Sequence, residues 1–121
     1  MNRLLNLAAI IEEATGLGLI AVPILVVRLL FGAEISGVSI PAARVTGIAL
    51  LGLGIACWPG PALLGMLTYG ALATAYLLYL AIQGDWVGLL LWPAVVSHAA
   101  LTLLLARTWF TDLHNQDNNE K

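Results

Sequence analysis

The few side chains of this chain that are capable of chemistry lie within long apolar stretches. Glu12 and Glu13 lie in the first stretch, Tyr69 and Tyr76 in a central one, and His98 in the last. A carboxylate and an imidazole that share a site of low polarity can exchange a proton or hold a ligand, and buried tyrosine hydroxyls need hydrogen-bond partners. The same residues also suit a polar contact that only fixes how helices align. The sequence leaves both interpretations open, and it leaves open which glutamate is buried.

Depth and chain direction favour a shared site for Glu12 and His98. If the first and last apolar stretches cross a membrane as helices, their midpoints fall near Gly18 and Ser97. His98 then lies almost at the bilayer centre, and Glu12 lies about 9 Å from it along the axis. Ionisable groups at that depth need partners and are candidates for function. We predict that the two side chains meet through a water or a tyrosine hydroxyl and are energetically coupled, provided that their helices are neighbours.

Two arginines lie near the ends of apolar stretches. Arg28 and Arg44 fall within a turn or two of the membrane face opposite the chain termini, where long side chains can reach lipid headgroups. They are candidate headgroup or anion contacts. Pairing with Glu34 and Asp85 is an alternative, and an anion or substrate site built from the arginines is another.

The elements that hold these residues follow from the distribution of charge. Residues 45–84 contain no Asp, Glu, Lys or Arg. At about 1.5 Å of rise per helical residue, this segment crosses a hydrocarbon core of roughly 30 Å twice. The whole chain has 60% hydrophobic and 10% charged residues, far fewer charges than a soluble domain carries. The composition therefore predicts an integral membrane protein.

We predict an all-α integral membrane four-helix bundle in one domain, residues 1–110. Its spans cover about 4–31, 41–58, 61–83 and 86–109, and residues 111–121 form a polar tail that we expect to be disordered. Met1-Asn2-Arg3 before an apolar stretch also suits a signal peptide, but Glu12 and Glu13 would interrupt it, so we expect a mature helix.

Turn residues set the limits of these spans. Pro23 is expected to kink the first one, and Trp58-Pro59-Gly60-Pro61 predicts a tight turn between the second and third. Ser39 is expected to cap the second span. Gly84 should end the third and Asp85 should cap the fourth, which places Trp86 and Trp109 in two interfacial belts. Pro93 is expected to leave the Leu89 carbonyl unpaired and open a polar pocket near His98.

Small residues share helix faces within two of the spans. Ala43, Gly47 and Gly54 lie on one face of the second span, and Ala71 and Ala75 lie on one face of the third. Such faces let helices approach closely, either inside one bundle or at the seam of a homodimer.

Several chemistries do not fit the sequence. No basic patch suits nucleic acid, and Cys57, the only cysteine, rules out an intramolecular disulfide. A di-iron bundle site needs two Glu-x-x-His pairs, which the chain lacks. His114 lies in the polar tail, so bis-histidine haem is excluded and only a single-histidine haem or a quinone contact through His98 is left. We expect no metal and no bound cofactor.

The charges outside the spans predict an orientation. An even number of spans puts both termini on one face, which carries Arg3, Arg107 and Lys121, whereas Arg28 and Arg44 lie on the other. The excess of positive charge favours cytoplasmic termini in an inner membrane. The difference is one charge, so dual topology is the alternative.

Four stretches resemble small bacterial membrane proteins of the DoxX-like kind. They read Glu-Glu-Ala-Thr-Gly at 12–16, Arg-Val-Thr-Gly-Ile-Ala-Leu-Leu at 44–51, Met-Leu-Thr-Tyr at 66–69 and Leu-Trp-Pro-Ala-Val-Val-Ser-His at 91–98. This resemblance implies a four-helix bundle in the bacterial inner membrane, and for DoxX itself a quinone-linked sulfur-oxidising complex. It carries no redox residue over to this chain.

The function expected from these features is that of an accessory or structural membrane protein without catalysis of its own. Its expected partners are the lipid bilayer and either a second copy or a larger membrane complex. One alternative is a quinone- or small-ligand-associated subunit. Another is a proton-coupled small multidrug exporter that uses a membrane glutamate, although the chain lacks the glycine-rich packing motif expected on the third and fourth helices of that family.

Overall fold

The computed structural model describes residues 3–58 and 62–121, and its secondary structure is α-helical. Five helices follow one another: α1 (Arg3–Ala21), α2 (Pro23–Phe31), α3 (Ser39–Cys57), α4 (Ala62–Gln83) and α5 (Leu91–Asn119). The described residues contain no strand. Most of the predicted turn at Trp58-Pro59-Gly60-Pro61 lies outside the described residues.

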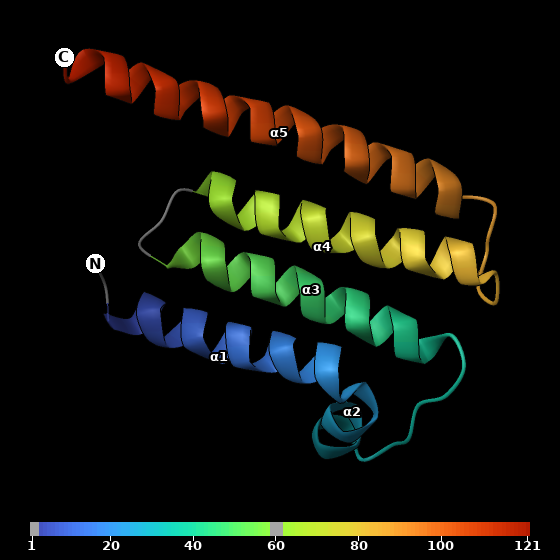
Figure 1. The fold of residues 1–121 in the computed structure, drawn as a ribbon. Coiled ribbons are helices and arrows are strands. Elements are labelled where there is room, and N and C mark those ends of the chain that lie inside the picture. Colours follow the sequence, from blue (N-terminus) through green and yellow to red (C-terminus); the bar gives the residue numbers. More distant parts are fainter. Residues whose placement is uncertain (1–2, 59–61) are drawn as a thin grey trace.

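The four long helices lie side by side in the order α1, α3, α4, α5 (Figure 1). Each contacts only the next long helix in this order, and α1 and α5 do not touch within the described part of the chain. We call this arrangement the helical layer. The all-helical prediction is confirmed, but the helical layer is not clearly the predicted four-helix bundle, because its first and last helices are not in contact. The start of α1 and the ends of α3 and α5 lie at one end of the layer, and α2 lies at the other.

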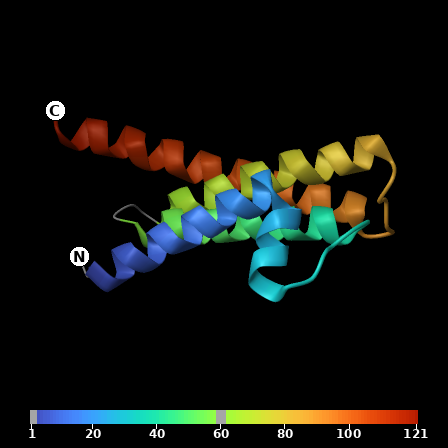
Figure 2. The same ribbon diagram turned by 90° about the horizontal axis from the view of Figure 1, so that it is seen from below.

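The first predicted span, 4–31, is two helices rather than one kinked helix. The backbone of Val22 leaves the helical region at φ −134° and ψ 63°, and Pro23 begins α2. A proline disfavours the helical conformation of the residue before it, so the chain turns here. In Figure 2, α2 runs across the direction of the long helices. It ends at Gly32, whose φ of 69° is a left-handed conformation that glycine adopts readily.

Glycines hold the helical layer together at close backbone contacts. A Cβ atom at Gly47 of α3 would lie 2.7 Å from the carbonyl oxygen of Gly16 of α1, and one at Gly65 of α4 would lie 2.6 Å from that of Gly52. Side chains there would force the helices apart. The packing interpretation is thus confirmed for Gly47, and likewise for Gly54, which lies against α1.

The alanines predicted to form a small-residue face on α4 behave differently. Ala71 and Ala75 are both exposed, so they are not buried in a close helix contact within the described chain.

The fourth predicted span begins later and ends later than expected. Gly84, with φ 81°, donates its N–H to the Leu80 carbonyl and ends α4 as predicted. Asp85 and Trp86, however, precede α5 instead of starting it, and Ser39 makes no side-chain capping bond on α3.

The tail expected to be disordered is helical to Asn119. Neither glycine nor proline follows Pro93, so nothing stops a helix that has already formed from adding further residues.

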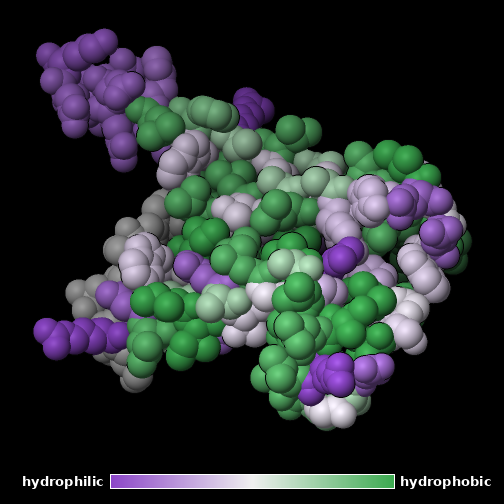
Figure 3. Space-filling view, turned by 60° about the horizontal axis from the view of Figure 1, so that its bottom comes forward, coloured by the Kyte–Doolittle hydropathy of each residue, from purple (hydrophilic) through white to green (hydrophobic). Residues whose placement is uncertain are grey.

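Three helices, α3, α4 and α5, are long and apolar enough to cross a membrane. Hydrophobic residues cover most of the face drawn in Figure 3, and a hydrophilic group lies at its upper left, at the end of α5. Few hydrophobic side chains of the described residues are buried. They are Ala9, Leu19, Ile48, Ala73, Leu80, Ala81 and Val95. A layer of this kind exposes far more apolar surface than water tolerates, which is compatible with insertion into a membrane.

Candidate functional site

Tyr69 of α4 and His98 of α5 form the polar contact between these two helices. The Tyr69 hydroxyl lies 3.3 Å from Nε2 of His98. The rings meet edge to face, with centroids 5.8 Å apart and planes inclined by 62°. Two of the four residues proposed for a polar site are therefore in contact, 29 positions apart in the chain.

The second ring nitrogen of His98 fixes its protonation pattern. Nδ1 lies 2.8 Å from the Ala94 carbonyl oxygen, which can only accept a hydrogen bond. Nδ1 must therefore carry hydrogen, and in the neutral ring Nε2 is the acceptor. The Tyr69 hydroxyl then donates to Nε2. The pair is therefore a hydrogen-bonded tyrosine and histidine in the contact between α4 and α5.

A small cavity adjoins this pair. It has a volume of about 70 Å³ and is lined by Met66, Tyr69, Gly70, His98, Leu101, Thr102 and Leu105. Pockets that bind small organic ligands are usually several hundred Å³. This cavity is too small for a quinone ring.

Gly70 and Thr102 complete the site, and the sequence interpretation missed both. The Thr102 hydroxyl donates to the His98 carbonyl at 2.7 Å, and a Cβ atom at Gly70 would clash with that hydroxyl oxygen. Thr102 follows His98 by four residues, one helical turn, and this spacing could have placed both on one face.

Glu12 does not belong to this site. It lies on α1, which contacts α2 and α3, while α3 and α4 separate it from α5. The predicted shared site of Glu12 and His98 depended on the first and last helices being neighbours, and this condition is not met in the described chain. Glu12 and Glu13 are both half-buried, and Glu13 packs with its Cγ against Gly54.

Tyr76 and Pro93 do not take the places predicted for them beside His98. Tyr76 stacks on Tyr79, with ring centroids 6.2 Å apart, and both line a separate cavity beside Arg44. Pro93 lies in the first turn of α5, so Leu89 precedes the helix and loses no helical hydrogen bond to the proline.

The two arginines differ from each other. Arg28 forms an ion pair with Glu34, with 3.4 Å between the charged atoms, and both side chains are largely exposed. This is the pairing with Glu34 that was predicted as an alternative to headgroup contact. Arg44 is half-buried, and its Nε atom is buried without a hydrogen-bond partner. Within residues 3–58 and 62–121 no carboxylate lies within 4.0 Å of it, so the alternative pairing with Asp85 is not formed.

Among the described residues, no group of three His, Cys, Asp or Glu side chains is placed to hold a metal ion. Comparison of the chain with protein-family models, with curated proteins and with solved structures finds no match.

Proposed function

We propose that this protein is a small integral protein of the bacterial inner membrane that serves as an accessory or structural subunit without catalysis of its own. In this proposal α1, α3, α4 and α5 all cross the bilayer, and α2 lies along the surface opposite the termini. The resemblance to DoxX-like proteins is part of the proposal, and it implies membership of a larger membrane complex.

The observation that carries the proposal is the open helical layer. α5 contacts only α4, and α1 contacts only α2 and α3, within the described chain. Val96, Leu103 and Leu104 of α5 are therefore largely exposed. In a membrane, lipid covers such a face without cost, so exposure alone does not require a partner. A helical layer with two free edges is, however, well suited to pack against another helical protein on both sides.

The Tyr69–His98 pair favours a second candidate function, that of a proton-handling or small-ligand-associated subunit. A tyrosine and a histidine lie in hydrogen-bond contact within α4 and α5, two of the helices proposed to cross the membrane, and ionisable groups in such helices are candidates for function. The exporter alternative gains less support, because Glu13 packs against Gly54 in the α1–α3 contact.

Site-specific photo-crosslinking in native cells tests the accessory function. A photo-reactive residue replaces Leu103, which is 71% exposed on α5, and the matched control position is Val95 on the same helix, which is 6% exposed. We expect Leu103 to give an adduct with another membrane protein and Val95 to give none. Adducts with lipid alone at Leu103, and at the exposed Ile10 of α1, would refute the accessory function. An adduct of twice the chain mass would identify the partner as a second copy.

A further inference from the structure

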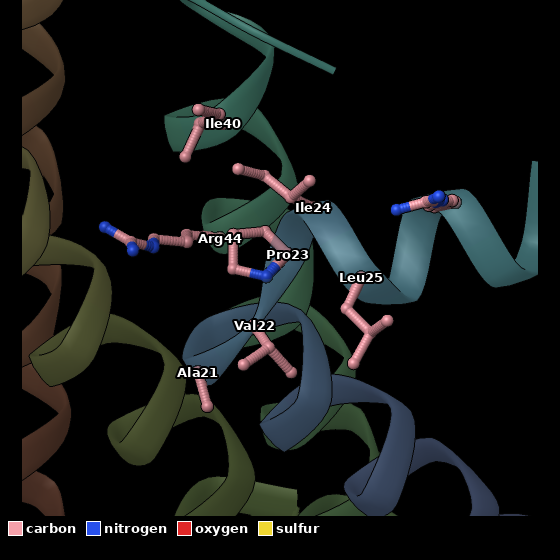
Figure 4. A pocket seen from close by; sticks show the side chains of 8 residues that line it. Ala21, Val22, Pro23, Ile24, Leu25, Ile40 and Arg44 are labelled. Atoms are coloured by element: carbon pink, nitrogen blue, oxygen red, sulfur yellow. The ribbon is translucent and has the colours of Figure 1, made fainter. Parts of the chain in front are cut away.

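Arg44 lies between two cavities at the α2 end of the helical layer. The larger cavity, about 440 Å³, lies beneath α2 and has apolar walls apart from the two arginines: Ala21, Val22, Pro23, Ile24, Leu25, Ile40, Arg28 and Arg44. The smaller, about 270 Å³, lies between α3 and α4. Ile40 and Arg44 line both. Figure 4 shows the Arg44 side chain extending away from Leu25 towards the α4 side.

The smaller cavity is rich in hydrogen-bond donors. Beside Arg44 it is lined by the side chains of Tyr76, Tyr79, Gln83 and Trp86, and no carboxylate is among its lining residues. Phenol, amide and indole groups all donate hydrogen bonds. A guanidinium group among such donors makes an environment that favours an anion.

The described residues provide no hydrogen-bond acceptor for Nε of Arg44. Its Nε atom is buried without a hydrogen-bond partner, and the single ion pair of the described chain at this end joins Arg28 to Glu34. A guanidinium nitrogen that is buried without an acceptor is costly, and more so in a membrane. Arg44 lies in the second turn of α3, so it would lie close to the lipid headgroups if α3 crosses a membrane.

We propose that Arg44, with the donors of the smaller cavity, binds the phosphate group of one anionic phospholipid, whose acyl chain lies in the apolar cavity beneath α2. Guanidinium groups recognise phosphate oxygens by paired hydrogen bonds. The break at Val22 turns α2 away from the helical layer and so forms the apolar cavity next to the phosphate site. This site is separate from the Tyr69–His98 pair and goes beyond the proposed function.

The test compares lipids and arginines in the purified full-length protein. The protein in a mild non-ionic detergent is titrated with phosphatidylglycerol or with phosphatidylcholine, and native mass spectrometry counts the lipids that stay bound. Wild-type protein should hold one phosphatidylglycerol in preference to phosphatidylcholine. Arg44→Gln should weaken phosphatidylglycerol binding by about tenfold or more, the effect of losing hydrogen bonds to a charged group.

Arg107→Gln is the matched control, because it removes an exposed arginine of α5 that lines neither cavity. It should change the affinity less than about twofold, as expected for a solvent-exposed charge. Equal losses in Arg107→Gln and Arg44→Gln, or equal binding of the two lipids by wild-type protein, would overturn the proposal.

Two further arms keep the test decisive. Should Arg44→Gln fail to fold, Gln83→Leu removes another donor of the smaller cavity and should also weaken phosphatidylglycerol binding, whereas unchanged binding would overturn the proposal. Inorganic phosphate at millimolar concentration should not displace the lipid. Displacement that depends on Arg44 would instead assign the site to free phosphate and overturn the lipid assignment.

Discussion

The contact between Tyr69 and His98 should appear as a coupling energy between α4 and α5. We consider Tyr69→Leu and His98→Leu, alone and together. The single substitutions each remove the same hydrogen bond and ring contact, so the double variant should lose less stability than the sum of the two. The Glu12→Gln and His98→Leu pair is the matched control, because α1 and α5 do not touch.

The geometry sets the size of the expected coupling. An oxygen-to-nitrogen distance of 3.3 Å is long for a hydrogen bond, and interhelical hydrogen bonds in membranes average about 0.6 kcal/mol. The edge-to-face ring contact adds about 0.5 to 1.5 kcal/mol. Together they predict a coupling of about 1 to 2 kcal/mol. Tyr69→Phe keeps the ring, so its coupling to His98→Leu should fall to about 0.6 kcal/mol.

The free energy of unfolding is measured by titrating SDS into detergent micelles and following helical circular dichroism. The control pair should be additive within about 0.5 kcal/mol, the usual limit for distant sites. Additivity of Tyr69→Leu and His98→Leu within the same limit would refute the contact. A coupling above about 1 kcal/mol between Glu12 and His98 would instead show that the helical layer closes in the membrane.

Three other predictions follow from the packing and the charges. Gly47→Leu should sharply lower the folded yield in membranes, because its Cβ would lie 2.7 Å from the Gly16 carbonyl oxygen. Gly88→Ala is the control and should leave the yield unchanged, because the space around Gly88 is open. Equal yields of the two variants would contradict the close contact at Gly47. Gly70→Ala should lower the free energy of unfolding by about 1 to 3 kcal/mol, because the added Cβ overpacks against Thr102. Adding Thr102→Ala to this variant should recover part of the loss. If it recovers none, another neighbour of Gly70 is responsible. Reporter fusions at both termini should report the cytoplasm and a tag within 34–39 the outside, and mixed signals from every fusion would indicate dual topology.

Local features of the sequence determined the helices and their membrane character. The segment 45–84 has no charged residue, and α3 and α4 occupy it, with Gly84 ending α4 by its left-handed conformation. These outcomes depend on hydrophobicity and on the backbone preferences of a few neighbouring residues. Both properties can be read directly from a sequence. The Val22-Pro23 step was also visible, but a proline in an apolar stretch predicts a kink or a full break equally well, and the neighbouring helices decide which forms.

Only the tertiary structure decided which polar residues meet. Depth and chain direction favoured Glu12 as the partner of His98, through a water or a tyrosine hydroxyl, whereas the packing order α1, α3, α4, α5 brings Tyr69 to His98. That order depends on contacts such as Gly16 with Gly47 and Gly52 with Gly65, which join residues far apart in the chain. Apolar helices are similar in composition, so the sequence alone does not show which glycine faces which neighbour. The same packing left Arg44 without a carboxylate partner, because Glu34 lies beside Arg28 instead.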